Sequence, residues 1–565
     1  MSASQEKKKR QHDLSGGNNK KLAAEQEAEK KKRQNRTRTI IYTGVFVLLV
    51  AFVTVVNSSF LYRYAAAYSI GDTSYNAAEV NYLYHSAYYN MVNQYGPEMV
   101  QMMGLDTSQP LQSQPYVDEE SEYETWADYF RQTSLDNLQN MSMLCDEAEA
   151  EGYVLTDADK KQIDEAMKGL EEAYESSDFP SMNRFLAANY GKGVTIEMVR
   201  NLVEKTVLAS SYSEHKRESF TYTDDELAAY YEEHKDEYDV FNYYSYTVTA
   251  ETDTTEYEEG QAPSEEEAEE IKAGFMAAAK EDADKILEED ITDAESFYEA
   301  VLTVVPEDSE STYPDKESLY RETPGSSLEA SYADWMKDSS REEGDTTVVE
   351  TDSGYVVLYF DSRFDNEYIT KNVRHILIKT MTPDEPEPAD EAATAGEQEE
   401  QLTEEEAEAA ALAAEEAAAK EEEEHAKAHE EADKISRAEI ERIYDEWKSG
   451  DATEESFAEL AAKYTEDEGS KDNGGLYENI AEGQMVPEFD AFAYDPSRKP
   501  GDTDIVHGES GSYEGYHLVY FAGDGMLYSN VMADNAKRSD DYTSWETSEL
   551  EKYDIVEQSM ARLAR

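Results

Sequence analysis

Asp338-Ser-Ser-Arg-Glu-Glu-Gly-Asp-Thr-Thr-Val-Val and Asp495-Pro-Ser-Arg-Lys-Pro-Gly-Asp-Thr-Asp-Ile-Val are two stretches of twelve residues that agree at seven positions without a gap. Chance alone would give about one identity over such a length. Trp335 and Phe492 also fall in register, because each stands nine residues before the glycine of its stretch. These matches indicate that the chain contains a duplicated unit.

The same order of elements surrounds both stretches. In the first copy, Phe241-Asn-Tyr-Tyr-Ser-Tyr-Thr-Val-Thr predicts a strand, residues 264–289 and a segment around Phe297 predict helices, and Gly354-Tyr-Val-Val-Leu-Tyr-Phe predicts a closing strand. In the second copy the strands are predicted over 373–379 and 515–521, with helices that end near Trp447 and run over 456–464. We expect two α/β units, 238–366 and 367–526, each with an antiparallel-rich sheet flanked by helices.

The segments outside the duplicated unit have helical patterns. Apolar residues recur at spacings of three and four over 62–237, and Thr156 and Thr223 each precede acids as capping residues do. Residues 527–565 read as a helical tail whose Trp545 is expected to pack on an earlier domain. The predicted fold class is therefore α+β.

Charge divides the chain at one apolar segment. Residues 1–38 carry twelve Lys and Arg against five acids, and no charged residue occurs from Thr39 to Tyr62. Residues 39–61 are long enough to cross a bilayer, and basic residues before them predict a cytoplasmic N-terminus with the rest outside. The alternative is a cleaved signal peptide, for which Ala65-Ala66-Ala67 offers a site, although a 38-residue basic region is long for one.

Composition excludes several functions. The net charge is −77 over 565 residues, and a nucleic-acid binder would need a basic footprint. Cys145 is the single cysteine, so an intramolecular disulfide and a Cys-x-x-Cys redox pair are both impossible.

An acidic insertion interrupts the second unit. Residues 381–424 hold eighteen acids and one lysine, and Thr403 to Trp447 predicts a long Ala/Glu helix with little to bury. A solvated spacer is the favoured interpretation, and calcium binding or partner docking are the alternatives. His425 and His429 are spaced like half a metal site, but no third ligand is placed, so no metal site is predicted.

Two histidines distinguish the second unit from the first. His375 lies on its opening strand and His517 on its closing strand, where the first copy has Val356. A buried imidazole needs a hydrogen-bond partner, and a histidine on a neighbouring strand can provide one. Such a pair is either a site or simply a satisfied pair in the core.

Residues 371–524 resemble the parvulin family of peptidyl-prolyl cis/trans isomerases, in particular extracytoplasmic foldases of the PrsA, PpiD and SurA type. The resemblance is carried by the strand with His375, Ser456-Phe-Ala-Glu-Leu-Ala-Ala-Lys-Tyr, the loop Gly469-Ser-Lys-Asp-Asn-Gly-Gly, Gly483-Gln-Met-Val-Pro-Glu-Phe and Gly515-Tyr-His. Residues 62–237 are more weakly similar to a SurA-type chaperone domain, and 238–366 resemble a degenerate parvulin repeat.

The resemblance implies a set of site residues. His375 and His517 are the paired histidines, Asp467 has an electrostatic role, and Leu476, Met485 and Phe489 form the pocket for the proline ring. The segment Gly474-Gly-Leu-Tyr is one residue shorter than the family pattern. No cofactor and no metal are implied.

The expected function is isomerisation of X-Pro bonds, together with chaperone activity, in unfolded secreted proteins at the outer face of a bacterial membrane. Asp384-Glu-Pro-Glu follows the first strand, and its charge disfavours phosphorylated substrates. The alternatives are a holdase without catalysis and an acidic, membrane-anchored surface scaffold.

Overall fold

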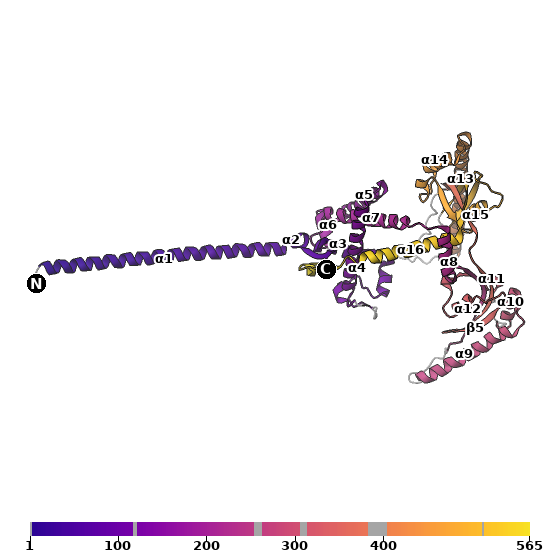
Figure 1. Cartoon of the computed structure of the whole chain (residues 1–565), viewed down its shortest axis with the longest axis horizontal. Coiled ribbons are helices and arrows are strands. Elements are labelled where there is room, and N and C mark those ends of the chain that lie inside the picture. Colours follow the sequence, from indigo (N-terminus) through magenta and orange to yellow (C-terminus); the bar gives the residue numbers. More distant parts are fainter. Residues whose placement is uncertain are drawn as a thin grey trace. The chain divides into compact units, whose positions relative to one another are not determined.

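The computed structural model describes residues 3–116, 121, 123–252, 263–305, 314–381, 404–510 and 513–564. The chain divides into two compact units, Met1–Thr221 with Arg538–Arg565, and Tyr222–Lys537. Helices dominate the first unit, and the second contains two sheets with their own helices (Figure 1). This mixture of helices and antiparallel sheet agrees with the predicted α+β class.

The first unit begins with a long helix, α1 (Ala3–Asn57). Its part Glu27–Val55 contains an 18-residue window with a mean hydropathy of 2.0, and none of this window is buried. Within the described part of the chain this is the one helix that is long and apolar enough to span a membrane.

The rest of the first unit is a helical body with one small sheet. The sheet order is β11-β1-β2, and every pairing in it is antiparallel. Thr156 caps its helix through a reciprocal pair of hydrogen bonds with Asp159, as predicted. The elements are α2 (Phe60–Tyr64), β1 (Ala66–Ile70), β2 (Thr73–Asn76), α3 (Ala77–Met102), η1 (Leu111–Ser113), α4 (Trp126–Glu151), α5 (Asp157–Glu175), α6 (Met182–Asn189), α7 (Ile196–Ser219), β11 (Ile555–Glu557) and η4 (Ala561–Leu563).

The C-terminal residues are part of this first unit. Helix α16 (Tyr528–Leu550) carries Trp545, which packs against a core that contains Leu138, Met143 and Tyr212. Strand β11 then pairs with β1. The expected packing of the tail on an earlier part of the chain is therefore confirmed, and the tail also adds a strand that the sequence pattern did not predict.

The second unit starts with α8 (Asp224–Tyr238), which Thr223 caps as predicted, and continues into a four-stranded antiparallel sheet of order β4-β3-β6-β5. Phe297 and Val357 are fully buried between this sheet and its helices. The elements are β3 (Val240–Thr249), α9 (Glu265–Glu288), α10 (Ala294–Leu302), α11 (Lys316–Leu319), β4 (Tyr320–Pro324), η2 (Gly325–Ser327), α12 (Ala333–Lys337), β5 (Thr346–Thr351) and β6 (Gly354–Phe364).

A second four-stranded antiparallel sheet has the equivalent order, β8-β7-β10-β9. In both sheets the opening strand pairs with the closing strand at the centre, and the strand that begins within the repeated twelve residues lies at an edge. The elements are β7 (Ile369–Lys379), α13 (Glu404–Ser449), α14 (Glu454–Tyr464), η3 (Lys471–Asn473), β8 (Leu476–Ile480), α15 (Pro487–Ala493), β9 (Thr503–Ser510) and β10 (Tyr513–Leu527). His507 to Ser510 thus form the last part of strand β9.

The repeated twelve residues build the same turn twice. Gly344 and Gly501 have φ of 97° and 99°, which glycine adopts without strain. Each donates its N–H to a carbonyl of the closing strand, Gly344 to Phe360 at 3.0 Å and Gly501 to Phe521 at 2.9 Å.

Both turns also contain an arginine at the same position. Arg341 lies over the Trp335 ring at 4.8 Å, and Arg498 lies over the Phe492 ring at 4.0 Å. The identities between the two copies therefore coincide with contacts that hold each turn against its closing strand and against the helix before it.

Candidate active site

The two histidines come from the central strands of the second sheet. In the β7–β10 register His375 is opposite Val519 and His517 is opposite Leu377, so the imidazoles are diagonal neighbours on one face. Their Nδ1 atoms are 3.0 Å apart, and the residues are 4% and 3% exposed. The structure brings together the pair that the sequence selected.

Asp467 completes a directed chain of hydrogen bonds. Its Oδ2 lies 2.8 Å from His375 Nε2, and the Tyr513 hydroxyl lies 2.9 Å from His517 Nε2. Since a carboxylate only accepts, His375 donates through Nε2 and accepts at Nδ1 from His517. Tyr513 then donates to His517. Each imidazole is satisfied in its neutral form.

Electrostatics favour this arrangement. Burial, followed by the charge of His375, lowers the pKa of His517 to about 3. The hydrogen bond from His375 holds the pKa of Asp467 far below its ordinary value, and hydroxyls of Ser470 and Tyr477 contribute at 2.5 and 3.0 Å. An ionised Asp467 therefore accepts from His375, and the His517 imidazole beyond it is neutral.

An aromatic and apolar cluster covers the pair. Phe489 is 1% exposed, and its ring meets both imidazoles edge to face with centroids 5.7 Å apart. Met485, Val486 and Tyr477 pack in the same cluster and are only partly buried. Helix α15 supplies Phe489, and the turn before it supplies Met485. Met485 and Phe489 thus belong to one cluster.

Leu476 does not belong to this cluster, which is a correction to the sequence-based assignment. It is opposite Arg374, whereas Tyr477 is opposite Val373, and Val373 shares a strand face with His375. Accordingly Tyr477 lies edge to face with His375, with centroids 5.2 Å apart. The Gly-Gly-Leu-Tyr segment is one residue shorter than the family pattern, so Tyr477 takes the position that the pattern gives to the leucine. This shortening was the signal in the sequence that could have indicated Tyr477.

Two glycines let β8 approach β7 closely. Gly474 and Gly475 have φ of 71° and 74°, and a Cβ on Gly475 would lie 2.2 Å from the His375 carbonyl oxygen. Across this contact His375 donates its N–H to the Gly475 carbonyl at 2.8 Å. The Gly-Gly pair therefore positions the backbone of His375. Ser470, Tyr477 and Tyr513 are site residues that the sequence reasoning missed.

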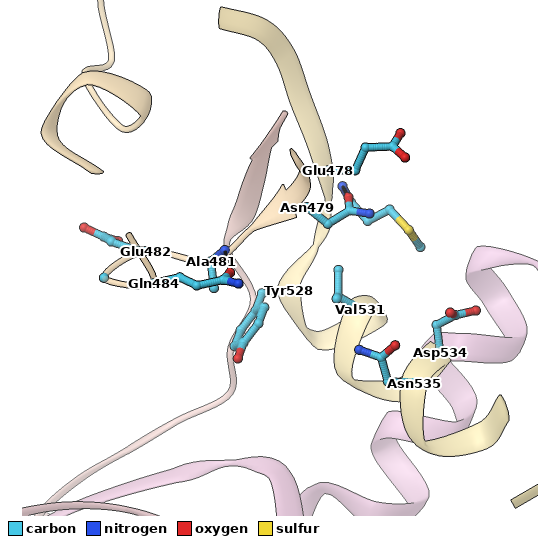
Figure 2. A pocket seen from close by; sticks show the side chains of 11 residues that line it. Glu478, Asn479, Ala481, Glu482, Gln484, Tyr528, Val531, Asp534 and Asn535 are labelled. Atoms are coloured by element: carbon cyan, nitrogen blue, oxygen red, sulfur yellow. Dashed lines mark hydrogen bonds between the residues drawn. The ribbon is translucent and has the colours of Figure 1, made fainter. Parts of the chain in front are cut away.

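A polar cavity of about 580 Å³ lies elsewhere in this unit, between the segment Glu478–Gln484 and helix α16 (Figure 2). Its lining includes Glu482, Asp534 and Asn535. Neither histidine nor Phe489 is among its lining residues. Its carboxylates and amides do not suit a proline ring, so it is not the candidate site.

Comparison with known proteins defines the class of this domain. Residues 422–523 match the rotamase family, described as the PPIC-type PPIASE domain. The chain therefore contains a parvulin-type peptidyl-prolyl cis–trans isomerase domain. His375 precedes the matched residues, on the other side of the acidic insertion.

One solved structure to which the chain is similar is the crystal structure of peptidylprolyl isomerase PrsA from Bacillus anthracis. The two chains are 19% identical, with a TM-score of 0.16, and the match covers 33% of this chain and 61% of that one. This chain thus spans less than two thirds of the length of the solved relative. No curated protein shows a significant match.

Proposed function

We propose that this protein is a membrane-anchored, extracytoplasmic foldase that isomerises X-Pro bonds in unfolded secreted proteins. The observation that carries the proposal is the chain Tyr513–His517–His375–Asp467 beneath Phe489. His375, Asp467 and His517 form the catalytic floor, and Met485, Phe489 and Tyr477 receive the prolyl ring.

The reaction is a rotation about an existing bond, so these residues need not make or break a covalent bond. Rotation about an X-Pro bond has a barrier of about 20 kcal/mol, because the amide loses its resonance when it twists. Water stabilises the planar, charge-separated amide, so the apolar contact with Met485 and Phe489 disfavours the ground state relative to the twisted one. His517 contributes a neutral imidazole to this floor, and the hydrogen bond to Asp467 fixes which nitrogen of His375 donates.

The proposed location rests on helix α1. We assign residues 1–38 as a cytoplasmic tail, 39–61 as the anchor, and 62–565 as the extracytoplasmic part. The exposed apolar side chains of Glu27–Val55 support this, because a soluble helix would leave them in water. Isomerisation needs no ATP, which suits an outer compartment.

We assign 62–237 as a helical chaperone domain and 238–366 as a degenerate parvulin-like domain. Residues 367–526 are assigned as the isomerase domain with the acidic insertion 381–424, and 527–565 as a helical tail. Residues 238–366 form a parvulin-like repeat that binds or spaces but does not catalyse, since Val356 stands where the second copy has His517. Discrimination against phosphorylated substrates is assigned to Asp384-Glu-Pro-Glu, which lies outside the described residues.

The test measures isomerisation of a proline-containing tetrapeptide by NMR exchange, with the full chain in detergent micelles. This readout needs no protease that would cleave the enzyme. We expect Met485→Ala to lower kcat/KM at least about 10-fold by removing apolar contact with the substrate. Met381→Ala is the matched control, because Met381 is 75% exposed and lies outside the cluster. Full activity in both Met485→Ala and His517→Gln would refute the assigned site.

A holdase activity in the helical unit is a second candidate. A cavity of about 600 Å³ there is lined by apolar residues such as Leu83 and Leu202, and by the amides of Asn137 and Asn140. The Asn140 Oδ1 atom is buried without a hydrogen-bond partner in the described structure. A peptide N–H could satisfy this oxygen while apolar side chains fill the cavity.

Suppression of aggregation of an unfolded client separates this activity from isomerisation. We expect Leu83→Asp to abolish suppression and to leave kcat/KM for the tetrapeptide unchanged. Val154→Asp, at a residue that is 76% exposed, should affect neither. If the wild-type protein neither suppresses aggregation nor isomerises, only the acidic surface scaffold remains.

A further inference from the structure

We propose that His429, Asp433, His507 and Glu514 form a binding site for a divalent transition metal, with Zn²⁺ as the preferred ion. The four residues come from three elements of one unit, helix α13 and strands β9 and β10. The site is separate from the His375–His517 pair and does not depend on the isomerase assignment.

Glu514 is the centre of the cluster. Its Oε2 lies 2.5 Å from His429 Nε2, and its Oε1 lies 3.1 Å from His507 Nε2. Two imidazoles therefore direct the same type of ring nitrogen at one carboxylate. A metal ion can bind where two imidazoles and a carboxylate converge in this way, because it takes the place of the hydrogen atoms between the ring nitrogens and the carboxylate oxygens.

Asp433 supplies the fourth ligand from one helical turn after His429, so both project from the same side of α13. Ligand atoms of Asp433, His507 and Glu514 all lie within 4.8 Å of one another. In a tetrahedral zinc site, ligand atoms are about 3.4 Å apart. Small side-chain rotations would therefore close the cluster around an ion.

Tyr516 supports this geometry from outside the cluster. Its hydroxyl donates to Asp433 Oδ1 at 2.7 Å, and its ring meets the His507 imidazole edge to face at 4.9 Å. Asp433 can keep this hydrogen bond and offer its other oxygen to the ion. A second layer of this kind orients metal ligands in known sites.

The ligand set selects the ion. Two imidazoles with two carboxylates suit zinc and its neighbours, whereas calcium and magnesium prefer oxygen ligands alone. His429, His507 and Glu514 have side chains that are 39%, 40% and 22% exposed, so an ion can reach them from solvent. The helix pair His425–His429 is not the site, because the partners of His429 come from the strands.

The experiment is calorimetric titration of the full chain, stripped with a chelator, with ZnCl₂ alone. We expect one equivalent with a Kd of about 10 µM or tighter, and weakening of at least about 30-fold in His429→Ala and in His507→Ala. His425→Ala, one turn away on the same helix, is the matched control and should bind as the wild type does. Millimolar Ca²⁺ should not displace the zinc.

Chemical modification localises the ion independently. Zn²⁺ should protect His429 and His507, but not His425, from acylation by diethyl pyrocarbonate, read by mass spectrometry of peptides. Absence of a saturable equivalent below about 100 µM zinc would overturn the proposal. The proposal would also be overturned if the His429→Ala/His507→Ala double variant still bound one equivalent of zinc, or if His425→Ala failed to bind it.

Discussion

At the scale of single residues, His517 couples the site to pH. Its pKa is lowered to about 3 by burial, while the unfolded chain takes up a proton near pH 6.5. Between these values the unfolded state binds one more proton, so the free energy of unfolding rises with pH. This contribution is complete above about pH 6.5 and is lost as the pH falls toward 3.

We therefore expect the second sheet to be about 2 kcal/mol less stable at pH 5 than at pH 7 because of His517 alone. Hydrogen exchange of β7 and β10 amides in the full chain, corrected for intrinsic rates, measures this. His517→Phe should show a flatter pH dependence, because it has no proton to take up. Equal slopes in both proteins would contradict the assignment of a buried neutral imidazole.

Substitutions at two neighbouring residues of β8 test which of the two side chains faces the histidines. Tyr477 contacts His375 and donates to Asp467, while Leu476 lies opposite Arg374. We expect Tyr477→Ala to lower kcat/KM at least about 10-fold, and Leu476→Ala to change it less than about 2-fold. The tetrapeptide exchange assay decides, and the reverse ranking would restore Leu476 to the site.

At the scale of elements, the close contact of β8 with β7 depends on glycine. A Cβ on Gly475 would lie 2.2 Å from the His375 carbonyl oxygen, so Gly475→Ala must displace one strand. Gly483 also has a positive φ, 80°, but nothing lies within 4 Å of its Cβ position. The two positions therefore share backbone strain and differ in steric contact.

We expect Gly483→Ala to cost about 1 kcal/mol, the strain of a left-handed alanine, and Gly475→Ala to cost at least about 2 kcal/mol more. Protection of the β7 amides against hydrogen exchange in the full chain reports both. Loss of isomerase activity should accompany Gly475→Ala alone. Equal costs would show that β8 can move away without consequence.

At the scale of the whole molecule, the proposed anchor makes a topological prediction. In a Cys145→Ser background, a cysteine placed by Lys427→Cys should react with a membrane-impermeant maleimide on intact bacterial cells. Lys7→Cys should react only after the cells are broken, because the basic tail stays in the cytoplasm. Labelling of both on intact cells would refute the orientation, and loss of the N-terminal residues from the mature protein would favour a cleaved signal.

The sequence by itself determined the duplicated unit, the helix starts at Thr156 and Thr223, and the membership of His375, Asp467, His517, Met485 and Phe489 in one cluster. These features are local patterns or specific motifs. Identical turn residues repeat because each copy needs the same positive-φ glycine and the same arginine on an aromatic ring.

Only the tertiary structure decided which side of β8 faces the histidines, because a shift of one residue in a strand exchanges its faces. It also decided that β11 joins β1, that Glu514 meets His429, and that Asp433 lies close to His507, although each partner is far away in the sequence. Contacts of this kind depend on strand register and on the packing of a helix across a sheet. Neither leaves a periodic signal along the chain.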